Sequence, residues 1–236
     1  VYKRQLYRIG IDNIVIEKHT QAYVLQRIRA GVLESRLVDL LREAGVSQRL
    51  ESEGLVHDGT SLSFDNERLR IDFKKHTGLP VIVYGQTEVT RDLYEARAAT
   101  NATTIFEANN VAINNANTDA PSVTYENGGV RHTINCDFIA GCDGFHGVSR
   151  TSIPSTVRKE FEKSYPFGWL GILSETPPVD HELIYSNSSR GFALCSMRNE
   201  NLSRYYIQCA TSDHPDNWSD DQLWYELRRR LPQDAD

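Results

Sequence analysis

Cysteine is scarce in this sequence: there are four in 236 residues, with no CxxC pair and no compact spacing among them. This scarcity excludes a disulfide-rich secreted scaffold and favours a reducing cytoplasm. No apolar run approaches the roughly 20 residues of a membrane span, so no membrane partner is expected. Acidic residues outnumber basic ones by 32 to 26, and this net charge of -6 argues against nucleic acid as a partner.

Several catalytic signatures are also absent. The sequence has no HxxxH metal spacing, no P-loop, no Gly-x-Ser-x-Gly elbow and no acid pair spaced as in a glycosidase. No metal site is therefore expected. The composition is that of a globular protein, with 39% hydrophobic and 25% charged residues. The length suits one large domain or two small ones.

The amino-terminal hundred residues predict an α/β arrangement. Residues 2–9 have a helical pattern, and the apolar segment 11–17 predicts a short buried strand that ends at Glu17. Apolar residues recur with helical spacing from Leu33 to Ala44, and Gly45 ends that helix. The order helix, strand, loop, helix is typical of a parallel sheet covered by helices.

The rest of the chain predicts mostly antiparallel strands. Alternation over 62–73 predicts exposed strands, and 138–140 predicts a buried strand. A capping box at Ser219 predicts a final helix. Further expected elements are a strand at 81–84, a helix at 87–98, a meander over 103–134 with a turn at 126–129, and strands at 182–185, 192–196 and 204–209.

The two chain ends are unlike natural termini. The chain begins with Val1 and closes with 231–236 directly after a helical pattern. We therefore expect an internal fragment of a longer polypeptide.

Three segments of the α/β part are candidates for binding a ligand. Glu17, at a strand end, could accept hydrogen bonds from a ribose, although such an acid is also common surface decoration. In 27–33, two arginines on one side of an extended segment could face a polyanion, and Ala30-Gly31 would admit a flat ring; the alternative is a solvated basic loop. In 141–147, three glycines and Asp143 indicate a ligand-binding turn rather than an ordinary Asp-Gly turn.

The later strands carry a second candidate cluster. Ser196 and Arg198 are two residues apart and share a face of one strand, as do Arg204 and Tyr206 on the next. With Tyr185, these groups could bind a small aromatic acid, the arginine holding its carboxylate and the tyrosine its phenol. The alternative is an exposed arginine among core tyrosines.

These motifs resemble those of the 4-hydroxybenzoate 3-monooxygenases, a family of single-component flavin aromatic hydroxylases. The resemblance runs from about Gly10 to Leu231, and Gly-x-Asp-Gly within it occurs across flavin hydroxylases in general. The combination of Tyr185, Ser196, Arg198 and Tyr206 is more specific to this family than Gly-x-Asp-Gly. The segments that carry the likeness are 27–34, 84–92, 139–147, 165–171, 181–185 and 190–196.

The resemblance implies hydroxylation of 4-hydroxybenzoate to 3,4-dihydroxybenzoate with FAD, NADPH and O₂, in a homodimer. It implies that Tyr185 is catalytic and contacts the phenol, with His57 at the outer end of a proton relay. Lys18-His19 replaces the Arg-Gln pair of NADPH-specific members, so NADH use stays open. The implied substrate-binding residues are Tyr185, Ser196, Met197, Arg198 and Tyr206; the implied cofactor-binding residues are Glu17, Lys18, His19, Tyr23, Arg27, Ile28, Arg29, Ala30, Gly31, Val32, Gln86, Asp143, Phe145, His146 and Arg204.

The expected fold is therefore an incomplete FAD-binding Rossmann-like α/β domain interleaved with an antiparallel-sheet substrate domain. The first would comprise 1–60 and 84–160, and the second 61–83 and 161–236. Two alternatives stay open: a flavin hydroxylase of another phenolic acid, and a truncated, non-catalytic binding module.

Overall fold

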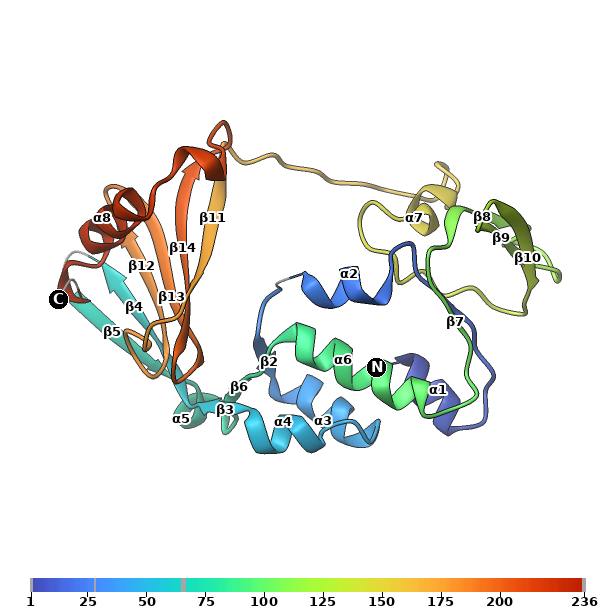
Figure 1. Cartoon of the computed structure of the whole chain (residues 1–236), viewed down its shortest axis with the longest axis horizontal. Coiled ribbons are helices and arrows are strands. Elements are labelled where there is room, and N and C mark those ends of the chain that lie inside the picture. The colour runs from blue at the N-terminus through green and yellow to red at the C-terminus, as the bar shows by residue number, and fades with distance from the viewer. Residues whose placement is uncertain (1, 28, 65–66, 235–236) are drawn as a thin grey trace.

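The computed structural model describes residues 2–27, 29–64 and 67–234, and it is a mixed α/β protein (Figure 1). A six-stranded sheet lies at one end, and most of the helices lie together beside it. This arrangement confirms the predicted fold class.

The large sheet combines an early hairpin with four late strands. Its order is β11-β14-β13-β12-β4-β5, and all neighbours are antiparallel except β12 and β4. The predicted strands at 62–73, 182–185, 192–196 and 204–209 are thereby confirmed. Its members are β4 (Gly59–Phe64), β5 (Glu67–Asp72), β11 (Phe167–Ser174), β12 (Leu183–Ser188), β13 (Gly191–Asn199) and β14 (Leu202–Ala210).

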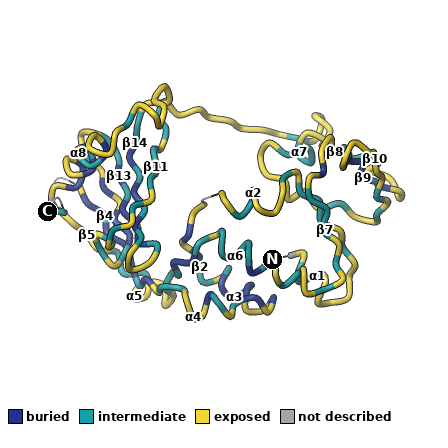
Figure 2. Tube along the Cα trace, viewed as in Figure 1, coloured by how far each residue is buried: buried dark blue, intermediate teal, exposed yellow. Residues whose placement is uncertain are grey.

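One face of the large sheet is covered by α8 (Asp220–Arg230), which begins at the predicted capping box of Ser219 and Gln222. Leu223 and Leu227 of α8 pack on the sheet, together with Ile207 of β14, and all three are buried. The burial view in Figure 2 shows buried positions alternating along the central strands. The opposite face, which we call the open face, is turned toward the helical part of the chain.

The helical part packs around a small antiparallel sheet of order β2-β6-β3. The helical pattern was predicted to begin at Leu33, but this was wrong: Leu33 lies in β2, where it pairs with Ile82, and the helix begins only at Ser35. Gly45 ends that helix with a φ of 69°, as predicted. The elements are β2 (Val32–Glu34), α3 (Ser35–Glu43), α4 (Gln48–Glu53), β3 (Leu55–His57), α5 (Phe73–Thr77), β6 (Val81–Val83) and α6 (Gln86–Ala98).

A third region holds the parallel pairing that the α/β pattern predicted. β1 (Val15–Ile16) pairs in parallel with β7 (Thr104–Ile105), but this strand is shorter and less buried than expected over 11–17. β8 (Asn109–Asn114), β9 (Ser122–Asn127) and β10 (Val130–Asn135) form the predicted meander. The remaining elements are α1 (Tyr2–Arg8), α2 (Gln21–Gln26), α7 (Val148–Ser152) and the 3-10 turns Pro215–Asn217 and Pro232–Asp234.

The prediction of a buried strand at 138–140 was wrong. No strand or helix lies between β10 and α7, and Phe138 is 92% exposed. A buried parallel strand needs neighbouring strands that satisfy its backbone groups, and none of the described strands pairs with this segment. An apolar run indicates a strand, but only partners from elsewhere in the fold can bury it.

A search of the described residues found no helix with the length and apolar character that crossing a membrane requires. The same part of the chain contains no group of three or more His, Cys, Asp or Glu residues that could hold a metal ion.

Candidate functional site

The open face of the large sheet gathers most of the predicted substrate-binding residues. Tyr206 of β14 lies opposite Leu194 of β13, which in turn lies opposite Tyr185 of β12. Directly paired residues of neighbouring strands share a face, so the two tyrosines belong to one row. Ser196 and Arg204 pair in the adjacent row. The predicted sharing of one face is therefore confirmed.

Met197 lies on the other face of the sheet. It stands between Ser196 and Arg198 on β13, and its side chain is 4% exposed. Because alternate side chains of a strand point to opposite faces, this side chain belongs with the buried core residues on the α8 side. The assignment of Met197 as a substrate-binding residue therefore stays a prediction, and it would have to act through its main chain.

Arg198 reaches from the open face to two glycines of the helical part. An ideal Cβ at Gly31 would lie 2.0 Å from Nη1 of Arg198, and one at Gly85 would lie 3.1 Å from Nη2. Its guanidinium forms no ion pair or hydrogen bond with any other described residue. Burial lowers the pKa of Arg198, although arginine stays charged at neutral pH. A half-buried, unpaired cation favours an anionic ligand.

A second arginine joins the same two parts of the chain. Nη1 of Arg204 donates a hydrogen bond of 2.7 Å to the carbonyl oxygen of Arg29. The guanidinium carbon of Arg204 also lies 4.5 Å from the ring centre of Tyr206. Burial, and then the charge of Arg198, lower the pKa of Arg204. The two guanidiniums therefore create a positive region where the sheet meets the segment 29–31.

Aromatic rings line the open face beside these arginines. The ring centres of Trp169 and Phe192 are 4.9 Å apart, and those of Phe192 and Tyr185 are 6.0 Å apart. Trp169 and Tyr185 are 50% and 38% exposed, so the surface they form is accessible. The sequence analysis missed Trp169 and Phe192 as candidates. The signal that could have found them is strand alternation, because Phe192 shares the face of Ser196.

Ser196 and Tyr206 are placed differently within the cluster. The hydroxyl of Ser196 donates to the carbonyl of Arg204 at 3.4 Å, a long contact that a better acceptor could replace. The ring of Tyr206 lies over Gly171 of β11, where an added Cβ would be 2.5 Å from Cε1. Gly171 therefore provides the space that Tyr206 occupies.

His57 lies on β3, away from solvent. It is 3% exposed, and neither ring nitrogen has a hydrogen-bond partner among the residues that the structure describes. Burial lowers the pKa of His57 below its ordinary value of 6.5; Glu182 and Asp180 oppose this effect and His181 adds to it. No hydrogen bond joins His57 to Tyr185 in the described part of the chain. Its assignment as the outer end of a relay stays a prediction.

The buried His57 should make stability depend on pH. A histidine that is harder to protonate when folded favours the unfolded state in acid. The free energy of unfolding should therefore fall as pH drops below 6.5, by up to about 1.4 kcal/mol per pH unit, until the folded-state pKa is passed. Urea denaturation between about pH 5 and 8 measures this slope. His57→Gln should flatten it, whereas the exposed His76→Gln should not; equal slopes in all three proteins would contradict the expectation.

Ala30 and Gly31 are held by main-chain hydrogen bonds at and just before the start of α6. The carbonyl of Gly31 accepts from Tyr84 N at 2.7 Å, and that of Ala30 accepts from Gln86 N at 3.0 Å. The side chains of Arg27 and Arg29 are exposed and form no ion pair with described residues, as a polyanion site would require. Val32 is 38% exposed at the start of β2. Ile28 lies outside the described residues.

Glu17 directly follows β1, at the predicted strand end. Its carboxylate accepts a hydrogen bond of 3.0 Å from His19 N. Burial raises the pKa of Tyr94, the charge of Glu17 raises it further, and the charge of Arg29 lowers it. Glu17 and Arg29 therefore lie near the same tyrosine of α6. The predicted contacts of Glu17 with a ribose and of Arg29 with a pyrophosphate stay predictions.

The residues predicted to meet the nicotinamide nucleotide form two separate groups. The first group lies around α2, a helix that was not predicted from the sequence. The rings of His19 and Tyr23 stack at 4.1 Å, and Arg27 donates to the Tyr23 hydroxyl at 3.4 Å. Phe145 and His146 make an edge contact at 5.0 Å before α7. No hydrogen bond or ring contact joins the two groups within the described ranges. Lys18 precedes α2 and forms no ion pair there.

Asp143 is turned into its own loop. Its carboxylate accepts from Ser149 N at 2.9 Å, and an added Cβ at Gly147 would lie 2.0 Å from its Cγ. Burial raises the pKa of Asp143, but hydrogen bonds from Ser149, Val148 and its own main chain outweigh that effect and lower it. The glycine turn therefore organises an ionised carboxylate at the start of α7.

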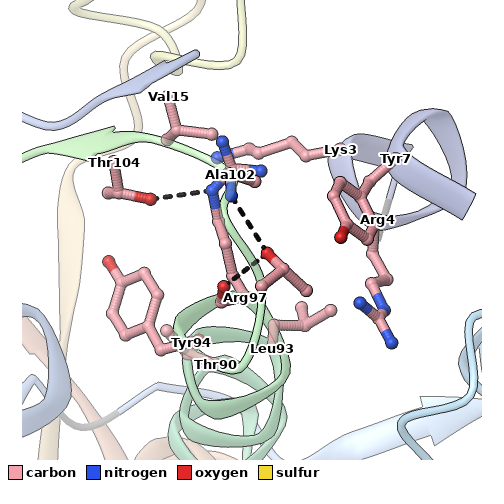
Figure 3. Close-up of a pocket in the computed structure, with 11 residues that line it drawn as sticks. Lys3, Arg4, Tyr7, Val15, Thr90, Leu93, Tyr94, Arg97, Ala102 and Thr104 are labelled. Carbon is pink, nitrogen blue, oxygen red and sulfur yellow. Dashed lines mark hydrogen bonds between the residues drawn. The ribbon is translucent and has the colours of Figure 1, made fainter. Parts of the chain in front are cut away.

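A separate pocket of about 200 Å³ lies between α1, α6 and β1 (Figure 3). None of the predicted site residues lines it. Arg97 crosses it and donates to four oxygens of Asn13, Thr103 and Thr104 at 2.6–2.8 Å. This arginine ties α6 to the parallel strand pair rather than offering a free cation.

Comparison with known proteins matches residues 3–236 to the family described as the FAD binding domain. The chain is 52% identical over 227 residues to p-hydroxybenzoate hydroxylase of Acinetobacter baylyi, covering 96% of this chain and 56% of that protein. The chain thus spans about half the length of the curated relative it matches.

Solved structures share the fold at low sequence identity. A probable FAD-dependent monooxygenase of Pseudomonas aeruginosa superposes with a TM-score of 0.75 at 17% identity, over 97% of this chain and 62% of that one. The p-nitrophenol 4-monooxygenase of Pseudomonas putida superposes with a TM-score of 0.74 at 13% identity, over 98% of this chain and 58% of that one.

Proposed function

Since the chain belongs to the FAD-binding domain family, we propose that it is part of a flavin-dependent monooxygenase that converts 4-hydroxybenzoate to 3,4-dihydroxybenzoate with NAD(P)H and O₂. The 52% identity to a protein named p-hydroxybenzoate hydroxylase supports this substrate. The activity is proposed for the whole protein, because the chain covers only 56% of that relative.

The unpaired guanidinium of Arg198 is the observation that carries the proposal. It is half-buried on the open face, two residues after Ser196 on β13, and it lies close to the charge of Arg204. A carboxylate there would gain a charge-assisted hydrogen bond from Arg198, and Ser196 and Tyr206 would add hydroxyl donors. The exposed rings of Trp169 and Tyr185 would receive the aromatic ring of the substrate.

The described residues fit FAD. A Cβ at Gly31 would displace the guanidinium of Arg198, and the exposed Arg29 forms no ion pair among the described residues. We infer that Glu17 would bind the ribose, Arg29 the pyrophosphate and Gln86 the ribityl region, with Arg204 near the ring system. The bound flavin would supply the redox chemistry and the oxygen activation. Further residues assigned to FAD are Arg27, Ala30, Gly31, Val32 and Asp143; Ile28 stays an assignment from resemblance.

The chain's own residues would prepare the substrate for attack by an electrophilic oxygen. A phenolate is a far better nucleophile than a phenol, so a base that removes the phenolic proton has a clear role. Tyr185 is the residue we assign to hold that hydroxyl, and His57 the one we assign to pass the proton outward. Lys18, His19, Tyr23, Phe145 and His146 are proposed to meet NADPH or NADH.

Substrate-dependent oxidation of NADPH tests the proposed function. The full-length protein, purified with FAD, is expected to oxidise NADPH much faster with 4-hydroxybenzoate than without it. Measured 3,4-dihydroxybenzoate should equal the NADPH consumed. Stimulated oxidation that releases only peroxide would show that 4-hydroxybenzoate triggers reduction but is not the true substrate, or that the Tyr185 relay is broken. No stimulation with FAD bound would reject the substrate assignment.

The assembly, compartment and domain boundaries remain proposals of the same kind. A homodimer is expected from the resemblance, and sedimentation of the full-length protein would test it. A cytoplasmic location is proposed from the scarcity of cysteine. The boundaries at 60/61, 83/84 and 160/161 would be tested by limited proteolysis.

A further inference from the structure

Glu88 is an acid that borders Arg198, yet the two do not pair. An ideal Cβ at Gly85 would lie 3.9 Å from Cγ of Glu88 and 3.1 Å from Nη2 of Arg198, so both side chains border the same point. Burial lowers the pKa of Arg198, and Glu88 is the charge that opposes this effect. No nitrogen of Arg198 forms an ion pair with a carboxylate in the described ranges.

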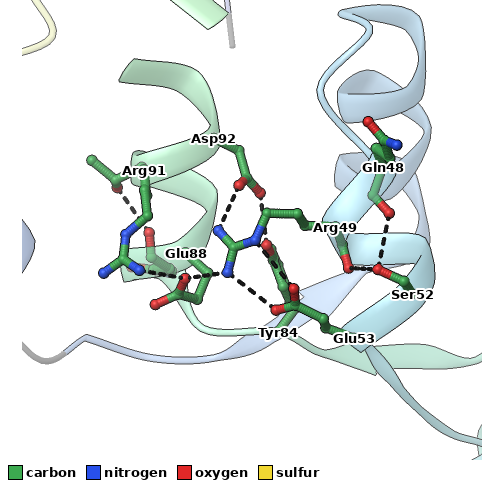
Figure 4. Close-up of polar contacts among 10 residues, drawn as sticks. Gln48, Arg49, Ser52, Glu53, Tyr84, Glu88, Arg91 and Asp92 are labelled. Carbon is green, nitrogen blue, oxygen red and sulfur yellow. Dashed lines mark hydrogen bonds and ion pairs between the residues drawn. The ribbon is translucent and has the colours of Figure 1, made fainter. Parts of the chain in front are cut away.

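The carboxylate of Glu88 is instead held by two other arginines (Figure 4). Its Oε2 lies 2.7 Å from Nη2 of Arg49 and 3.4 Å from Nη1 of Arg91. Arg49 belongs to α4, whereas Glu88 and Arg91 belong to α6. The shorter contact therefore draws Glu88 toward the neighbouring helix.

Arg49 is itself fixed by other partners. Its guanidinium contacts Glu53 at 3.1 Å and Asp92 at 2.8 Å. Asp92 is 9% exposed and also accepts a 2.7 Å hydrogen bond from the Tyr84 hydroxyl. The hydrogen bonds that Arg49 donates to Glu88 and Glu53 raise the pKa of Arg49, so it stays charged. This cluster gives Arg49 one defined position between α4 and α6.

We propose that Arg49 is a positioning residue for substrate binding: it holds Glu88 on the side of α4 and so keeps Arg198 available for an anionic ligand. The inference rests on the proposed function, in which Arg198 binds a carboxylate. Without Arg49, Glu88 can turn toward Arg198 and compete with that carboxylate. Specificity for acids would then depend on keeping an internal competitor away.

The test compares an acid with its neutral amide. In the full-length, FAD-loaded protein, dissociation constants for 4-hydroxybenzoate and 4-hydroxybenzamide are measured from the change in flavin absorbance. Arg49→Gln is expected to weaken binding of the acid about tenfold, the effect of one competing, partly buried ion pair, and to leave the amide within about twofold. Arg49→Gln combined with Glu88→Gln should restore the affinity for the acid, because the competing carboxylate of Glu88 is then absent.

The control is Arg42→Gln. Arg42 also forms an ion pair with α4, at 2.6 Å to Glu51, but it lies on α3 and its side chain is 48% exposed. It should leave both constants unchanged. If Arg49→Gln does not fold, Arg91→Gln is the substitute, because it removes the second cation that contacts Glu88 and the Arg91 side chain is 43% exposed. It should weaken binding of the acid about threefold.

Equal weakening of acid and amide by Arg49→Gln would overturn the inference, since it would show a structural role. The inference would also be overturned if the variant carrying both Arg49→Gln and Glu88→Gln did not regain affinity for the acid. If the unaltered protein binds acid and amide equally, the proposed function itself fails, and the role of Arg49 falls with it. Selective loss with recovery in the double variant would establish Arg49 as the positioning residue.

Discussion

Arg198→Gln should weaken 4-hydroxybenzoate binding about 100-fold or more, because it removes the charged partner of a partly desolvated carboxylate. FAD binding should change little, since the guanidinium of Arg198 lies beside Gly31 and Gly85 but forms no hydrogen bond with the described residues of that loop. Titration of the flavin-loaded protein with the acid measures the loss. Arg198→Lys should recover little, because an ammonium group lacks the planar fork of arginine.

The matched control for Arg198 is Arg190→Gln. Arg190 precedes the same strand and pairs with Glu226 of α8, so it changes the same charge on the other side of the sheet. It should bind the acid normally. An Arg198→Gln protein that keeps its affinity for 4-hydroxybenzoate within threefold would contradict the assignment of the carboxylate site.

Gly31→Ala should have an effect of similar size. The new Cβ would lie 2.0 Å from Nη1 of Arg198, which is well inside contact distance. The loop cannot easily retreat, because Gly31 O and Ala30 O accept hydrogen bonds from Tyr84 N and Gln86 N. The guanidinium must therefore move, and acid affinity should fall about 100-fold, as for its removal. FAD affinity should fall too, since the same loop is proposed to border the flavin.

A double variant separates the steric effect from a general one. If Gly31→Ala acts on the acid through Arg198, adding it to Arg198→Gln should cause little further loss. Gly168→Ala is the control, because its Cβ would meet only Cys209 Sγ at an ordinary 3.9 Å. Full additivity of the two changes would show that Gly31 acts on the acid by another route.

Local patterns in the sequence predicted most of the strands and one face of the site. Strand alternation placed Ser196, Arg204 and Tyr206 together correctly, because the period of a strand fixes which side chains share a face. The same rule would have placed the side chain of Met197 on the opposite face, whereas the resemblance alone does not indicate a face. The capping box at Ser219 likewise predicted where α8 begins.

Interactions across long separations could not be predicted in this way. The apolar segment 138–140 failed as a strand because no described strand pairs with it. The contact of Arg198 with Gly31, and that of Arg49 with Glu88 across 39 positions, depend on how whole elements pack. No periodicity in the sequence contains that information. The aromatic pair of Trp169 and Phe192 forms for the same reason, from strands paired only in the fold.

The alternation of the large sheet also bears on how such a protein can change during evolution. Packing against α8 involves Ala193, Cys195 and Ile207, whereas their immediate neighbours along the strands point to the open face and do not belong to that buried core. Mutation of every second residue can therefore explore new ligands at little risk to folding. A library that randomises Phe192, Leu194 and Ser196 while preserving the residues between them would sample new specificities in proteins that still fold.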